Sequence, residues 1–106
     1  MKKEELKKST AAGIVDETNY VLRLFITGAT PNSIRAVENI KHICESHLKG
    51  KYSLEIFDVY QQQQLAETEQ IVALPLLIKK KPLPERRLIG DLSDTEKVLK
   101  GLGLFG

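Results

Sequence analysis

The stretch YVLRLFITGATPNSIRAVENI, from Tyr20 to Ile40, combines an apolar segment, a tight turn and the first turns of a helix. Residues 20–26 are almost continuously apolar and β-favouring, which is typical of a strand buried on both faces inside a sheet. Thr30 is suited to accept a backbone N–H as an N-cap, and Pro31 suits the first helical position, where no donor is needed. This stretch therefore predicts an inner strand followed at once by a helix.

The helix is expected over residues 31–48, with one apolar stripe facing the core. Apolar side chains recur at spacings of three and four residues, at Ile34, Val37, Ile40, Cys44 and Leu48. Gly50 stands where a left-handed C-cap is expected. Cys44 is interpreted as a small core side chain, because burial among apolar groups disfavours the reactive thiolate.

A second strand is expected over residues 52–59, after the helix. Strand, helix and strand together predict a βαβ unit with parallel strands and a right-handed crossover. Arg23 interrupts the first strand. Such an arginine is either paired with a carboxylate inside the structure or available as a surface contact.

The second half of the chain predicts a helix, a strand, a turn, an antiparallel strand and a final helix. In chain order these are expected over residues 65–74, 76–78, 79–85 and 86–89 and from Ser93 onward. Ser93 and Glu96 have the spacing of a capping box, which favours a helix there. The order βαβαββα predicts an α/β fold with a four-stranded mixed sheet.

Composition places the chain among small globular domains. It has 106 residues, 42% of them hydrophobic, and a net charge of +2, which is too small to indicate wholesale nucleic-acid binding. Residues 1–18 are rich in charged and small residues and are expected to form a flexible arm before a domain over residues 19–106.

The expected location is cytoplasmic. No apolar run approaches the ~20 residues that span a bilayer, and the first residues lack the apolar segment of a signal peptide. A single cysteine excludes an intrachain disulfide and fits a reducing compartment. His42 and His47 lie five residues apart, off the four-residue spacing of helical metal ligands, so we expect no metal.

The order of elements, with Pro75 opening the third strand, resembles the thioredoxin-like fold. In redox members of that fold, Cys-x-x-Cys follows the first strand, at a helix N-terminus that stabilises a thiolate. This chain has Gly28-Ala29-Thr30-Pro31 there, so disulfide exchange has no nucleophile and no cofactor is expected.

Three stretches together are similar to the KaiB family: residues 20–40, 50–67 and 74–102. The motif G-x-TPNS-x-RA spans Gly28 to Ala36, and the motif P-x-x-RR-x-IGDLS spans Pro84 to Ser93. Both motifs are long and specific. The resemblance covers about four fifths of the chain.

The resemblance implies a non-enzymatic regulator that docks on the N-terminal ATPase ring of a KaiC-type RecA-like ATPase. In clock members it also captures KaiA and competes with a sensor histidine kinase. It further implies a metamorphic chain: a resting homo-oligomer, dimer or tetramer, ordered βαββααβ, and a thioredoxin-like partner-binding form ordered βαβαββα. Only the C-terminal half differs between these forms.

The family's interaction surface carries over to Arg35, Lys79, Arg86 and Arg87. Residues 79–87 contain five basic groups against one acid, and the two arginines are suited to bind carboxylates. A solvated turn and a protein-docking site both fit this run. Nucleic acid fits least, because no aromatic side chains interleave with the charges.

Residues expected to permit the change of fold are Pro75, Pro82, Pro84, Gly101 and Gly103. The isomers of an X-Pro bond differ by only about 0.5–1 kcal/mol and exchange over tens to hundreds of seconds. Glycines weaken the last helix. A switch of fold is therefore expected to be slow and low in energy.

Two other functions stay open. One is a thiol or glutathione-dependent enzyme that uses Cys44, and the other is a detached KaiB-like sensor module of a histidine kinase. The chain also departs from clock members, which usually have an aspartate where Gly103 stands and carry an acidic tail. These departures weaken the expectation of a resting tetramer and of a KaiA partner, so the regulator is expected either in a clock or in a clockless pair with a KaiC-type ATPase, for example in stress adaptation.

Overall fold

The computed structural model describes residues 19–104. Its elements, in chain order, are β1 (Tyr20–Ile26), α1 (Pro31–His47), β2 (Tyr52–Asp58), α2 (Gln64–Thr68), β3 (Leu76–Lys81), β4 (Arg86–Ile89) and α3 (Thr95–Gly101). The expected order βαβαββα is confirmed. The arm expected over residues 1–18 lies outside the described residues.

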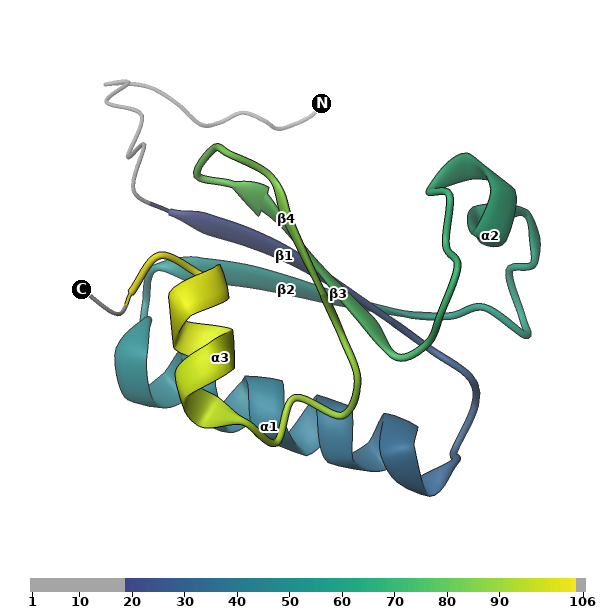
Figure 1. Cartoon of the computed structure of the whole chain (residues 1–106), viewed down its shortest axis with the longest axis horizontal. Helices are drawn as coiled ribbons and strands as arrows, with labels where there is room; N and C mark the ends of the chain where they lie inside the picture. Colours follow the sequence, from purple (N-terminus) through teal and green to yellow (C-terminus); the bar gives the residue numbers. More distant parts are fainter. Residues whose placement is uncertain (1–18, 105–106) are drawn as a thin grey trace.

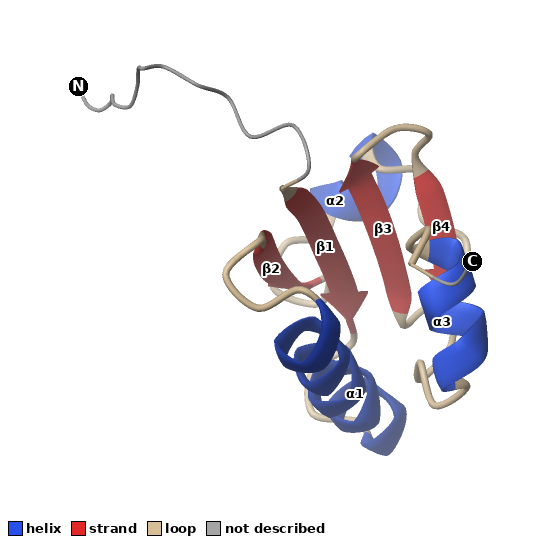
Figure 2. Cartoon of the chain, turned by 90° about the vertical axis from the view of Figure 1, so that its left-hand side faces the viewer, coloured by secondary structure: helices blue, strands red, loops and turns tan. Residues whose placement is uncertain are grey.

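The four strands form one mixed sheet in the order β2-β1-β3-β4. β1 pairs with β2 in parallel and with β3 in antiparallel register, and β3 pairs with β4 in antiparallel register. Helices α1 and α3 lie on one face of this sheet, and α2 lies near the other (Figure 1). Figure 2 shows β1 and β3 as the inner strands.

The predicted inner strand is confirmed, with Leu22, Leu24 and Phe25 fully buried. Leu22 and Leu24 point toward α1 and α3, whereas Phe25 points to the opposite face and stacks on Phe57 with ring centroids 5.2 Å apart. Alternation along the strand therefore supplies two separate apolar clusters from one segment.

Helix α1 begins as predicted, and most of its predicted apolar stripe is confirmed, since Ile40, Cys44 and Leu48 are buried and Val37 packs against them. Thr30 accepts a hydrogen bond from the Ser33 backbone N–H, and Pro31 follows as the first helical residue. Ile34, expected in the core, is 47% exposed, whereas Ser33 and Ala36 are buried. The stripe therefore departs from expectation at its first member only, where the small side chains of Ser33 and Ala36 are buried in place of Ile34.

The second half departs from expectation at three places. Helix α2 has only five residues, against the longer segment expected over 65–74. β3 continues through Lys79–Lys81, which were expected in a turn, because these residues pair with β1. The side-chain cap of α3 is Asp94, whose carboxylate accepts from the Lys97 N–H, and not Ser93.

Candidate protein-binding surface

Arg35, the first predicted contact residue, is held by groups of the same chain. Its Nε lies 3.0 Å from Asp91 Oδ2, and its Nη2 donates to Asn32 Oδ1. Asn39 Nδ2 adds a 2.8 Å bond to the Asp91 carbonyl. The guanidinium is half-exposed, so it fixes the loop before α3 while it remains open on one side.

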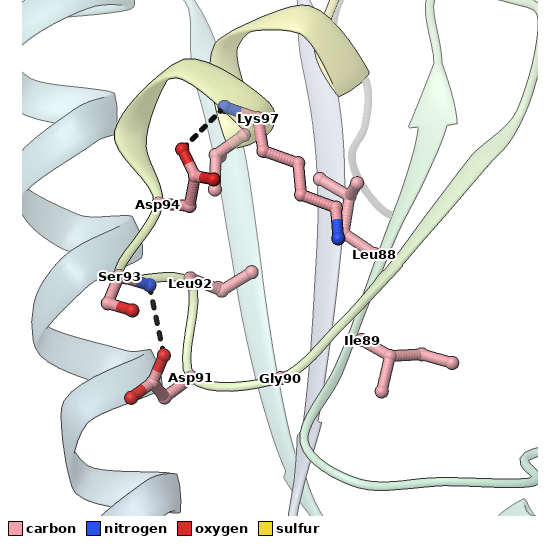
Figure 3. A pocket seen from close by; sticks show the side chains of 9 residues that line it. Leu88, Ile89, Gly90, Asp91, Leu92, Ser93, Asp94 and Lys97 are labelled. Carbon is pink, nitrogen blue, oxygen red and sulfur yellow. Dashed lines mark hydrogen bonds between the residues drawn. The ribbon is translucent and has the colours of Figure 1, made fainter.

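Asp91 connects the two sequence motifs. Hydrogen bonds from Ser93 and then from Arg35 hold the pKa of the Asp91 carboxyl below its ordinary value. Figure 3 shows Asp91, Ser93 and Asp94 at one side of a small hollow between β4 and α3, with Leu88 at the other side. Sequence reasoning quoted the IGDLS motif but did not assign Asp91 this role.

Lys79 lies inside the sheet and not in an exposed turn. It faces Leu22 on β1 and Arg86 on β4 across the ladders, and it is only 5% exposed. Burial, and secondly the charge of Arg86, lower the pKa of the Lys79 ammonium. The stem of this side chain is therefore part of the fold, and at most its end reaches a partner.

Arg86 and Arg87, the remaining two predicted contact residues, have different surroundings. They are neighbours on β4, and successive side chains of a strand point to opposite faces. Arg87 donates from Nη2 to the Glu69 carbonyl at 2.7 Å and from Nη1 to the Gln70 carbonyl at 3.3 Å. Arg86 is exposed and makes no side-chain ion pair or hydrogen bond within residues 19–104. It is thus the most available of the four predicted cations.

The proposed switch residues flank the strands of the second half. Peptide bonds before Pro75, Pro82 and Pro84 are all cis. A Cβ at Gly101 would lie 2.8 Å from the Leu88 side chain, so glycine lets α3 close on β4. Gly103 has a φ of +77°, which favours glycine.

The N-terminus of α1 carries hydroxyl groups where redox members of this fold carry thiols. Thr30 Oγ1 donates to Ser33 Oγ at 2.8 Å, and Ser33 Oγ also accepts from the Thr27 N–H. Cys44 lies deep in the same helix, where burial, and secondly Glu45, raise the pKa of its thiol to about 12. In the described part of the chain, no group of three or more potential metal ligands occurs.

Within residues 19–104, no helix combines the length and the apolar character that a membrane span requires.

The strand order, the helix packing and Pro75 before β3 define a thioredoxin-like protein without the cysteine pair of the redox enzymes. Solved structures agree. The N-terminal domain of Synechococcus elongatus SasA superposes with a TM-score of 0.67 at 26% identity, over 94% of this chain and 93% of that domain.

Mitochondrial thioredoxin 3 of Saccharomyces cerevisiae has a TM-score of 0.64 at 13% identity, over 82% of this chain and 80% of that one, and this likeness concerns the fold alone. The chain belongs to the KaiB family, whose KaiB domain matches residues 23–104.

Two relatives illustrate the match. The circadian clock oscillator protein KaiB of Prochlorococcus marinus subsp. pastoris is 52% identical over 92 residues, which cover 87% of this chain and 86% of the relative. The protein of the same name from Synechococcus elongatus is 53% identical over 86 residues, covering 81% and 84%.

Proposed function

We propose that this chain is a non-enzymatic regulator that binds the N-terminal ATPase ring of a KaiC-type ATPase in a clock or a clock-like stress-adaptation system. Family membership carries the proposal, since relatives at 52–53% identity over most of their length are named as clock oscillator proteins. The helix N-terminus that holds the reactive cysteines in redox relatives carries hydrogen-bonded hydroxyls, which supports a binding role over thiol chemistry.

The contact surface in this proposal is centred on Arg86. Its guanidinium is exposed and unpaired in the described residues, so binding a carboxylate there breaks no internal contact. Arg35 contributes its open side, and Lys79 contributes the end of its side chain. Arg87 supports the surface without contacting the partner, because its guanidinium already donates to the carbonyls of Glu69 and Gln70.

The proposal includes a change of fold in the C-terminal half. The arrangement described above corresponds to the partner-binding form, and the resting form is an oligomer ordered βαββααβ. Sparse packing of the two C-terminal-half helices supports this: α2 buries no residue fully, and Val98 is the only residue of α3 that is buried. Elements that rearrange generally belong to the less stable parts of a structure.

Size-exclusion chromatography with a KaiC-type ring and ATP tests this function. We expect the wild-type chain and the control Lys49→Glu, an exposed charge reversal after α1, to elute with the ring. Arg86→Glu should elute separately while keeping the circular dichroism of the wild type. If the wild type elutes separately after prolonged incubation, or if both reversals bind equally, the proposed surface is wrong.

A KaiA-like protein and a histidine kinase remain further candidate partners under the same proposal. The detached sensor module is the second candidate function, and the likeness to the SasA N-terminal domain favours it. Identity to that domain is 26%, half of the 52% shared with KaiB, and this places the regulator first. Pull-down against a kinase and a KaiC-type ring in parallel separates the two.

A further inference from the structure

The two faces of the sheet are covered unequally. On one face, α1 and α3 enclose a large apolar cluster. On the other, the cover is the chain between β2 and β3, residues 60–74, which we call the strap (Figure 1). Beneath the strap lie Phe25, Leu76 and Ile78, each 2% exposed or less. The strap alone therefore shields this apolar face of β1 and β3 from water.

Apolar contacts hold the strap only in part. Its α2 segment has no fully buried residue, and Leu65, Ala66 and Ile71 pack on the cluster while remaining partly exposed. Val72 is 90% exposed and contributes little. Because hydrophobic stabilisation scales with the apolar area removed from water, these side chains anchor the strap less firmly than α1 is anchored.

Charged groups supply a second attachment, centred on Glu69. Its Oε2 lies 3.6 Å from Arg23 Nη1 on β1, and its Oε1 lies 3.3 Å from Lys80 Nζ on β3. Arg87 on β4 binds the carbonyls of Glu69 and Gln70. Three strands thus each direct a cation at the same two residues. The Glu69 side chain is only 14% exposed, so water competes for it weakly.

The charges continue outward with alternating sign. Arg23 Nε lies 3.3 Å from Glu55 Oε1 on β2, and Glu85 lies within 4 Å of both Lys80 and Arg87. The network therefore reaches all four strands. Its outer members are a third or more exposed, so dissolved ions screen them.

We propose that the strap is a closure held by the charge network at Glu69, and that ionic strength sets how often it opens. Opening separates residues 60–74 from the sheet and exposes the apolar cluster around Phe25, while α1 and its cluster stay intact. This closure is a property of the chain alone and does not depend on the proposed partner.

Amide hydrogen exchange tests the closure in the full chain, at about 0.01 M and about 1 M NaCl, where the Debye length falls from about 30 Å to about 3 Å. The backbone N–H groups of Glu69 and Ile71 bond to the carbonyls of Leu65 and Ala66 at 2.9 Å, inside the strap. They report on opening because so short a helical segment does not keep its hydrogen bonds in water once it leaves the sheet. Amides of α1 report on the whole fold.

Glu69→Gln is compared with Glu67→Gln, which removes the same charge from an exposed site on α2 that makes no ion pair in residues 19–104. At low salt we expect Glu69→Gln to accelerate exchange of the strap amides about three- to tenfold with α1 unchanged, and Glu67→Gln to match the wild type. At high salt the wild type should approach Glu69→Gln.

Equal exchange in the two variants contradicts the closure, and so does acceleration of strap and α1 amides together. If Glu69→Gln does not fold, the wild-type salt series decides. Strap amides that exchange at one rate at both salt concentrations contradict the proposal, and a selective rise at high salt supports it.

Discussion

Nε of Arg35 lies 3.0 Å from Oδ2 of Asp91, and this ion pair joins α1 to the loop before α3 across 56 residues of sequence. The two residues come from the two long motifs that identify the family. The motifs therefore meet in space, and Arg35 positions the C-terminal half in addition to any contact with a partner.

Asp91 makes stability depend on pH. Its pKa is lowered in the folded state by Ser93 and Arg35, so its contribution is full above the ordinary aspartate pKa of about 3.9 and is lost as pH falls through the lower folded value. The difference in urea midpoint between wild type and Asp91→Asn should thus be largest at neutral pH. Circular dichroism at pH 7 and below pH 4 measures it, and a difference that stays constant contradicts the assignment.

Arg87 and Arg86 should separate stability from binding. Arg87→Ala removes two donors from the 69–70 carbonyls and should lower the free energy of unfolding by about 1 kcal/mol. Arg86→Ala removes an exposed group that has no partner among residues 19–104, and it should change the free energy of unfolding by less than about 0.5 kcal/mol. Urea unfolding of both variants checks this, and equal losses would show that Arg87 has no special internal role.

Ile40 and Ile34 form a matched pair on α1. Ile40 is fully buried, so Ile40→Ala should destabilise the chain by about 2–5 kcal/mol through lost burial and a cavity. Ile34 is 47% exposed, and Ile34→Ala should cost about 1 kcal/mol or less. Thermal and urea unfolding report both values. The reverse order would contradict the packing of α1 described above, in which Ile40 is enclosed and Ile34 faces water.

Cys44 should be inert in the folded chain. Burial raises the pKa of its thiol to about 12, so almost no thiolate exists at pH 8. Iodoacetamide should label it at least about 100-fold more slowly in native buffer than in urea. Mass spectrometry follows the labelling, with Cys44→Ala as the blank. Rapid labelling of the folded chain would favour the alternative thiol enzyme.

Local signals predicted the first half of the fold well. The apolar run of β1, the Thr30 cap and Pro31 each act within a few residues, and all three are as expected. The predicted stripe of α1 was wrong only at Ile34, because apolar spacing favours that residue whereas the small side chains of Ser33 and Ala36 are buried there.

Long-range pairing limited the prediction of the second half and of the site. Lys79–Lys81 have the composition of a turn, and only their pairing with β1 makes them a strand. Strand alternation over 86–89 is the one local signal in this region that bears on the site, because it makes the side chains of Arg86 and Arg87 point apart. The role of Glu69 could not be predicted from the residues around it, because its partners come from three strands distant in sequence.

The enclosed position of Cys44, the only cysteine of the chain, has a consequence for the cell. The architecture needs no reductant to be maintained, and oxidants find no accessible sulfur on α1 to alter. Oxidation of this thiol would first require the core beneath α1 to open.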